Sequence, residues 1–249
     1  MAQWGKLTYA QKSALGSTGK LMKDLEMIRE GSRVGIAVSG GVDSFLLLRL
    51  MTMRRRIVPF SFEIMALHVN PGFEPENHAP LARWVRENGI AAHLELTDHG
   101  PRAFSEENRT TSACFYCARL RRKRLFILCR EYNLTHLAFA HTAEDLASTF
   151  FMNLFQTGKV YGLDAKADFF GGGLSVIRPL LFLEKKTIRK AAKDFGLPVW
   201  ENPCPASGES RRTDFEEWLE QIWSKEKFYK RNVLNALKRW QLDSNRSLD

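Results

Sequence analysis

Short apolar segments alternate with longer helical segments along most of the chain. The segment "RVGIAVS" (33–39) is short and β-branched, and a polar turn joins it to "VDSFLLLRLMTMRRR" (42–56), whose pattern is typical of a helix. A repeated strand–helix order predicts a mostly parallel sheet with helices on both faces. We therefore expect an α/β, Rossmann-like fold.

Five strands are expected in this sheet, and helical segments extend it at both ends. The strand segments are 33–39, 61–70, 90–98, 135–140 and 174–180. We expect an N-terminal helical extension over 1–32, with a helix at 19–31 closed by Gly31, a central domain over 33–208, and a C-terminal helical extension over 209–249. In such sheets ligands bind at the carboxyl ends of the strands.

The charge of the chain favours a polyanionic partner. Lys and Arg number 37 against 28 Asp and Glu, which gives a net charge of +9 and a pI of about 9.5. Nucleic acid is the usual partner of such a chain, although general solubility explains the same excess. No segment approaches the roughly 20 apolar residues of a membrane span, and the first residues lack a signal-peptide pattern. We expect a cytoplasmic protein with no membrane partner.

The turn "SGGVDS" has the composition of a phosphate-binding loop. Glycines allow backbone N–H groups to approach a phosphate closely, and the N-terminus of the following helix favours negative charge. The turn matches neither GxxxxGK[ST] nor GxGxxG, and two glycines also suit a purely steric turn. The alternative role for Asp43 is a helix cap, which the whole hexapeptide favours less. The candidate ATP-binding residues here are Ser39, Gly40, Gly41, Asp43 and Ser44.

Three of the four cysteines suit a metal site. Cys114 and Cys117 form C-x-x-C, and Cys204 follows in "ENPCPASG". The C-x-x-C pair alone is compatible with redox chemistry, zinc binding or chance. Cys129 lies on an apolar helical face and is expected to be a buried thiol. Three thiolates without a fourth ligand suit an Fe–S cluster with one open iron.

Whole motifs resemble a known family. The hexapeptide SGGVDS resembles the SGGxDS loop of the PP-loop, or N-type ATP pyrophosphatase, family, and this implies an adenine nucleotide alpha hydrolase-like fold. It also implies ATP cleavage between the α and β phosphates, with Asp43 helping to hold Mg²⁺. "CFYCARLRR", "VIRPLLFLEKKTI" and "ALHVNPGF" resemble the tRNA 2-thiocytidine synthetase group. That likeness implies a [4Fe–4S] cluster on Cys114, Cys117 and Cys204.

Two segments depart from the group's pattern. One cysteine, Cys204, stands where the group has a second C-x-x-C, and "AHTAED" (140–145) replaces H-H-x-D-D. His141 and Asp145 keep their places there, and we expect them to position phosphate, Mg²⁺ or the activated oxygen. His68 or Asn70, after the second strand, is expected near the adenine or ribose.

The resemblance implies a tRNA thiolation enzyme. It would adenylate a pyrimidine carbonyl oxygen and insert sulfur supplied by a cysteine desulfurase or as inorganic sulfide, and it would form a homodimer. Salt-dependent RNA binding is expected from Arg121, Arg122, Lys123 and Arg124. Two alternatives stay open: a ligase of the tRNA lysidine synthetase type, and a non-catalytic zinc- or nucleotide-binding RNA-binding protein.

Overall fold

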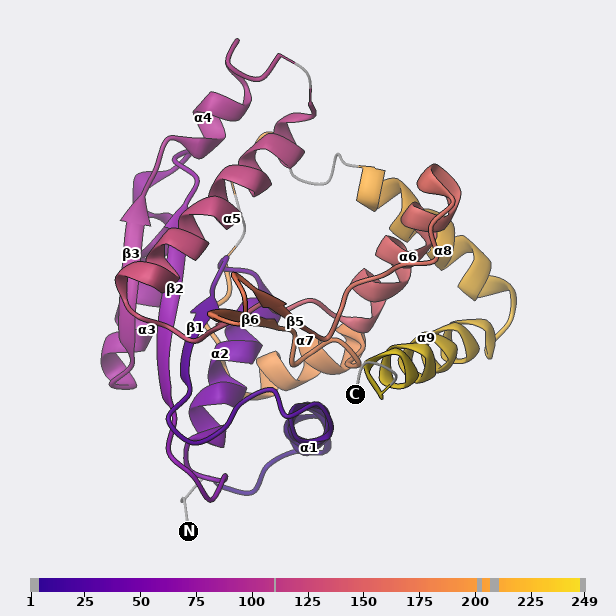
Figure 1. The fold of residues 1–249 in the computed structure, drawn as a ribbon, viewed down its shortest axis with the longest axis horizontal. Helices are drawn as coiled ribbons and strands as arrows, with labels where there is room; N and C mark the ends of the chain where they lie inside the picture. Colours follow the sequence, from indigo (N-terminus) through magenta and orange to yellow (C-terminus); the bar gives the residue numbers. More distant parts are fainter. Residues whose placement is uncertain (1–4, 110, 201–202, 207–210, 247–249) are drawn as a thin grey trace.

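A six-stranded sheet forms the centre of the computed structural model, which describes residues 5–109, 111–200, 203–206 and 211–246. The strand order is β3-β2-β1-β4-β6-β5 (Figure 1). Neighbouring strands pair in parallel except β5 and β6, which form an antiparallel hairpin. The strands are β1 (Arg33–Ala37), β2 (Glu63–Asn70), β3 (Ala91–Leu96), β4 (His136–Ala138), β5 (Lys166–Phe169) and β6 (Leu174–Ile177).

The mostly parallel, Rossmann-like α/β sheet is confirmed, but the expected number of strands is wrong. The additional strand is β5, at the edge of the sheet. Its sequence "KADF" contains two charged residues and no β-branched residue, and its side chains are half-buried or exposed. Such a segment carries neither an apolar run nor a clear alternation, so the usual strand signals are missing.

Helices connect the strands and extend beyond them. They are α1 (Tyr9–Asp24), α2 (Val42–Arg54), α3 (Ala79–Glu87), α4 (His99–Ala103), α5 (Ala113–Glu131), α6 (Ala143–Thr157), α7 (Lys185–Asp194), α8 (Arg211–Lys225), α9 (Tyr229–Arg246) and the 3₁₀ helix η1 (Pro75–His78).

The first helix lies earlier in the chain than expected. It begins after Thr8, whose hydroxyl accepts from the N–H of Gln11 while the Gln11 side chain accepts from the Thr8 N–H. This reciprocal capping box fixes the start of the helix, and α1 ends at Asp24 rather than near Gly31. Gly31 has a φ of +75° and lies in the turn before β1.

Two apolar cores cover the two faces of the sheet. The larger contains side chains of α1, α2, α3 and α7, with Phe45 and Met51 fully buried. The smaller lies under α5, where Leu128 and Cys129 pack with Leu67 and Val176 of the strands. The helix α5 therefore lies on the opposite face of the sheet from α2.

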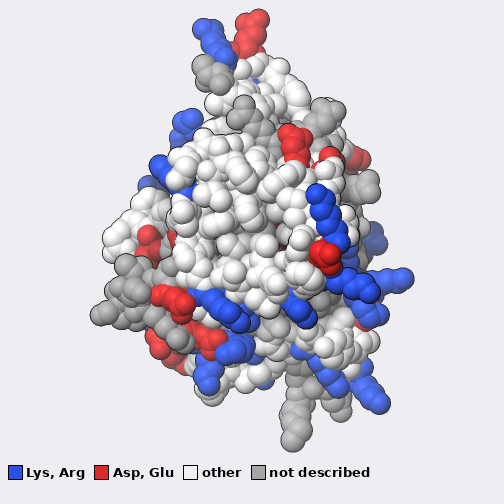
Figure 2. Space-filling model, turned by 90° about the vertical axis from the view of Figure 1, so that its right-hand side faces the viewer, with Lys and Arg blue, Asp and Glu red and all other residues white. Residues whose placement is uncertain are grey.

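The last two helices pack against α6, away from β3 and β2 (Figure 1). On the face shown in Figure 2, charged side chains gather mainly in the lower half, and uncharged surface fills the middle. Phe155, which is 61% exposed, packs against Trp218 of α8. The division of the chain at residues 32 and 208 stays a prediction.

Across the part of the chain that the structure describes, no helix combines the length and the apolar character that crossing a bilayer requires.

Candidate functional site

The glycine turn (residues 39–44) lies where the strand order reverses. Strands β1 and β4 are neighbours, and the chain leaves β1 toward β2 and leaves β4 toward β6. Crevices form at such switch points, at the carboxyl ends of the strands. The turn follows β1, and the "AHTAED" segment follows β4. The topology thus brings both predicted motifs to one edge of the sheet.

Hydrogen bonds between two serines hold the turn in shape. The hydroxyl of Ser44 accepts from the Ser39 N–H at 3.1 Å and donates to the carbonyl of Gly41 at 2.9 Å. Gly40 has a φ of +99°, a conformation that favours glycine. No side chain caps the start of α2, so Asp43 does not act as the helix cap. The first N–H groups of α2 are left available to an anion.

A cavity of about 660 Å³ opens beside this turn. Its walls come from the turn, from the ends of the central strands, from α5 and from the start of α8. Polar and charged groups on these walls are Ser39, Gly41, Asp43, Ser44, Arg121, Arg122, His141, Arg178 and Arg212. Four arginines around one carboxylate make the cavity a strong site for a polyanion such as a nucleoside triphosphate.

Asp43 carries an unusual protonation equilibrium. Burial raises its pKa to about 6, and the nearby Asp145 carboxylate adds to the rise. Within the described residues, its Oδ1 atom is buried without a hydrogen-bond partner. A buried carboxylate oxygen without a partner fits a cation that arrives with the ligand.

The surroundings of His141 keep its ring neutral, with one N–H available as a hydrogen-bond donor. The Nε–H of Arg178 donates to its Nδ1 atom at 3.2 Å, which leaves the proton on Nε2. Burial, together with the charge of Arg178, lowers the pKa of His141 to about 4. The ring is therefore neutral at physiological pH.

Asp145 lies behind the cavity wall and orders its surroundings. Its Oδ2 atom accepts from the N–H and the hydroxyl of Thr142, in a capping box at the start of α6. Its Oδ1 atom lies 3.7 Å from Arg212 and 4.0 Å from Lys185. Asp145 therefore holds the cationic side chains of Arg212 and Lys185 in place. Asp145 itself does not line the cavity.

The two residues expected near the adenine or ribose lie outside this cavity. Asn70 is fully buried, and its amide donates to the carbonyl of Glu74 and to Asn77, which fixes the loop after β2. His68 donates from Nδ1 to the Val38 carbonyl at 2.7 Å, and its ring meets Trp200 edge to face. Their predicted contact with the nucleotide stays a prediction.

The three predicted cysteine ligands gather at the start of α5. The charges of Cys114 and Cys204 both act on Cys117, and burial raises the pKa of the Cys117 thiol while Arg121 opposes the rise. The Cys114 Sγ atom lies 3.8 Å from the carbonyl of Ala206, beside Cys204. The described residues contain no group of three or more His, Cys, Asp or Glu side chains placed to hold a metal ion.

The four basic residues expected to bind RNA point in different directions. Arg121 is half-buried between the cavity and the thiols of Cys117 and Cys204. Arg122 and Lys123 are exposed. Arg124 is paired with Glu95 at 2.7 Å and with Glu131 at 3.1 Å. The run therefore does not form one continuous patch.

Several site residues were missed by the sequence analysis. Arg178 lies in the quoted "VIRPL" segment without an assigned role, and its place after a strand was the one available signal. Lys185 and Arg212 reach Asp145 from α7 and α8. Trp200 packs over Gly40. Tertiary packing alone brings these residues to the turn, and no local pattern marks them.

Comparisons with known proteins agree with this geometry. The model of the PP-loop domain family matches residues 12–213. A tRNA-cytidine(32) 2-sulfurtransferase of Geobacter sulfurreducens is 31% identical over 91% of this chain and 89% of its own length. The enzyme of the same name from Syntrophotalea carbinolica is 34% identical over 79% of this chain and 75% of its own.

Two solved structures share the fold. A U34-tRNA thiolase from Methanococcus maripaludis with its [4Fe–4S] cluster superposes with a TM-score of 0.74 at 21% identity, covering 96% of this chain and 86% of that one. An NH3-dependent NAD synthetase from Campylobacter jejuni gives a TM-score of 0.52 at 17% identity, covering 95% and 94%. The family match over residues 12–213 and the relatives at 31% and 34% identity show that the chain belongs to the PP-loop domain family.

Proposed function

We propose that this enzyme is an ATP-dependent tRNA sulfurtransferase that replaces O2 of a cytidine with sulfur. The main support for this proposal is that the glycine turn and Arg121 line the same cavity. Arg121 in turn interacts electrostatically with Cys117 and Cys204. A site for nucleotide activation and a site rich in thiols therefore lie side by side. The curated relatives, named for 2-sulfurtransfer to tRNA cytidine, support the same chemistry.

The first step is adenylation of the base. The cytidine O2 attacks the α-phosphorus of ATP, and pyrophosphate leaves, so that a poor leaving group becomes a good one. The backbone N–H groups of the glycine turn bind the phosphates, and Arg178 and Arg212 offset the charge that develops. Neutral His141 donates from Nε2 to an oxygen of the reacting group.

Magnesium fits the carboxylate of Asp43. Its Oδ1 atom, buried without a hydrogen-bond partner among the described residues, is a hard oxygen ligand beside the phosphate site. Mg²⁺ held there would neutralise part of the phosphate charge. We propose Asp43 as its protein ligand.

We propose Cys114, Cys117 and Cys204 as the residues that would hold a [4Fe–4S] cluster. The charges of Cys114 and Cys204 act on Cys117, and the U34-tRNA thiolase that shares this fold contains a [4Fe–4S] cluster. Held there, such a cluster would supply an iron able to bind sulfur.

Sulfur insertion completes the reaction. Sulfide adds at C2 of the adenylated base, and AMP leaves with the former O2. Arg121, between the thiols and the cavity, is placed to attract the anionic sulfur species. We propose a cysteine desulfurase or inorganic sulfide as the sulfur source, a cytoplasmic location and a homodimer as the working assembly.

Nucleoside analysis of tRNA tests this proposal. Cells that lack the protein should lose 2-thiocytidine, and the wild-type gene should restore it. Asp43→Asn, which keeps the side-chain shape, should not restore it. Unchanged 2-thiocytidine in the deletion strain would contradict the proposal, and loss of lysidine instead would favour a ligase of the lysidine synthetase type.

A further inference from the structure

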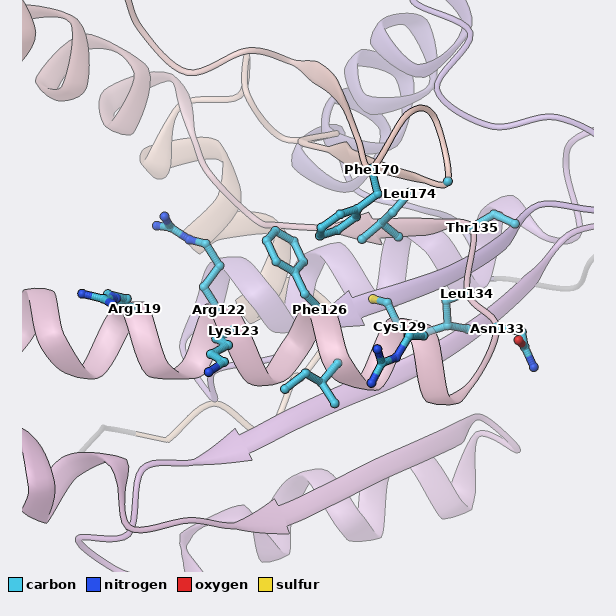
Figure 3. Close-up of a pocket in the computed structure, with 13 residues that line it drawn as sticks. Arg119, Arg122, Lys123, Phe126, Cys129, Asn133, Leu134, Thr135, Phe170 and Leu174 are labelled. Atoms are coloured by element: carbon cyan, nitrogen blue, oxygen red, sulfur yellow. The ribbon is translucent and has the colours of Figure 1, made fainter.

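A second hollow lies along α5, beside the nucleotide cavity. This α5 groove measures about 880 Å³ and runs between α5 and the β5–β6 hairpin. Its apolar lining comes from both sides, with Phe126 and Cys129 on α5 facing Phe170 and Leu174 (Figure 3). Burial raises the pKa of Cys129 to about 12, so this thiol serves as inert apolar floor.

Unpaired positive charge surrounds the α5 groove. Arg119, Arg122, Lys123 and Arg130 are exposed and line it, and no acidic residue does within the described part of the chain. Arg119, Lys123 and Arg130 are four and seven residues apart, which keeps them on one side of the helix, and Arg122 lies at the border with the nucleotide cavity. Among the described residues none of the four is paired with a carboxylate, whereas the neighbouring Arg124 is paired with Glu95 and Glu131. The groove therefore attracts anions.

An exposed aromatic side chain lies over this groove. Phe170 is 72% exposed and has a φ of +56°, which is uncommon for a residue with a bulky side chain. Its ring meets Phe126 edge to face, with the ring centres 5.8 Å apart. Exposed aromatic rings with cations nearby are the elements that proteins use to stack unpaired nucleobases.

The α5 groove and the nucleotide cavity share two wall residues. Arg122 and Phe126 line both. A chain lying in the groove can therefore pass its next residue into the cavity without leaving the protein surface. An apolar floor with a cationic rim matches a flat base attached to a phosphate backbone. It suits an acidic peptide less well, because no residue of the edge strand β5 lines the groove among the described residues.

We propose that the α5 groove binds an unpaired nucleotide of the RNA substrate, next to the base that enters the cavity. The base stacks on Phe170, and Arg119, Lys123 and Arg130 contact the flanking phosphates. This inference rests on the proposed function, because it takes the polyanion to be RNA.

RNA binding by groove variants tests the proposal. The probe is a fluorescein-labelled RNA hairpin with a single-stranded loop containing cytidine, measured by anisotropy over a salt titration. Phe170→Ala should weaken binding about tenfold or more because the stacking surface is removed. Arg119→Ala/Arg130→Ala should weaken it and reduce the salt slope by roughly 0.7 for each phosphate that these arginines neutralise in the wild type. ATP-binding affinity without RNA should stay unchanged in both.

The matched control is Arg55→Ala/Arg56→Ala, which removes the same charge from exposed positions after α2, on the opposite face of the sheet. If the control weakens RNA binding as much as the groove variants, the proposal is wrong. If the wild-type protein binds the RNA and the groove variants bind it equally well, the groove proposal is wrong and the proposed function still stands. Wild-type protein that binds no RNA overturns both. A dimer that groove variants convert to monomer would overturn it too, by showing that a second copy occupies the groove.

Discussion

Trp200 covers Gly40 at the centre of the glycine turn. Its backbone N–H donates to the Gly40 carbonyl at 3.2 Å, and its indole occupies the space where a Cβ atom of residue 40 would lie, 2.2 Å from Cε2. Trp200 is also four residues before Cys204. The glycine turn is therefore in direct contact with Trp200, close in the chain to the third cysteine.

Gly40→Ala is expected to damage the turn. The new methyl group would collide with Trp200, and a φ of +99° is strained for alanine. We expect pyrophosphate release to fall at least tenfold and the free energy of unfolding to fall by about 1–3 kcal/mol. Gly16→Ala, in α1 with no atom within 4 Å of the new methyl, is the control and should stabilise by roughly 0.5–1 kcal/mol. Equal effects of the two substitutions in urea denaturation would contradict this account.

Acid should destabilise the protein through its histidines. The pKa values of His68, His136 and His141 are lowered to about 4, mainly by burial, whereas the pKa of a histidine in the unfolded chain is 6.5. The unfolded state therefore binds more protons between these values, so this stability is complete above pH 6.5 and is lost as the pH falls toward 4. Between about pH 7 and pH 5, the free energy of unfolding of His68→Gln should therefore decrease by about 1–2 kcal/mol less than that of the wild type. Parallel curves for wild type and variant in chemical denaturation would rule this out.

The order of helices and strands was predictable because strands that are buried on both faces of a parallel sheet consist of short apolar runs. The central strands and the turn after β1 follow this rule, whereas β5 lies at an edge and does not. The run of Arg121 to Arg124 shows a different failure. Successive residues of a helix point about 100° apart, so a basic run on α5 had to be divided among several surfaces. Here the period of the helix was the available signal.

The cations around Asp145 could not be predicted from local pattern. Arg212 and Lys185 lie 67 and 40 residues after it in the chain. Packing of α8 against α6 brings Arg212 close, and a hydrogen bond from the Lys185 N–H to Glu144 holds the start of α7 beside α6. Long-range packing of this kind depends on the whole fold rather than on a motif.

Arg212→Ala is expected to slow ATP-dependent pyrophosphate release. Arg212 lines the cavity and is held by the Thr149 hydroxyl at 3.1 Å and by Asp145 at 3.7 Å. Loss of a preorganised cation should lower kcat/KM by about 10–100-fold, with partial recovery in Arg212→Lys. Arg231→Ala, which removes an exposed cation of α9, serves as the control and should leave the rate unchanged. A normal rate for Arg212→Ala would show that this cation does not act on the phosphates.

An ion pair fastens α9 to α6. The Lys230 Nζ atom lies 2.7 Å from Glu144, whose side chain is 6% exposed, and 3.4 Å from Glu184. A double-mutant cycle with Glu144→Gln and Lys230→Met should give a coupling free energy of about 1–3 kcal/mol in urea denaturation. The exposed pair Lys20–Asp24, at 2.8 Å, is the comparison, and its coupling should stay below about 0.5 kcal/mol. Similar couplings for both pairs would mean that burial does not strengthen the α9 contact.

The four cysteines should separate into two classes when each is changed to serine. Cys114, Cys117 and Cys204 gather at the start of α5, whereas Cys129 is buried in the core beneath the helix. We expect each of the first three variants to lose iron from anaerobically purified protein and to lose tRNA thiolation. Pyrophosphate release should persist in them, because the glycine turn is untouched. Cys129→Ser should keep iron and thiolation while unfolding at lower urea, since its hydroxyl would be buried in an apolar site. Full iron content in Cys204→Ser would remove that residue from the ligand set, and loss of iron in stably folded Cys129→Ser would place the cluster elsewhere.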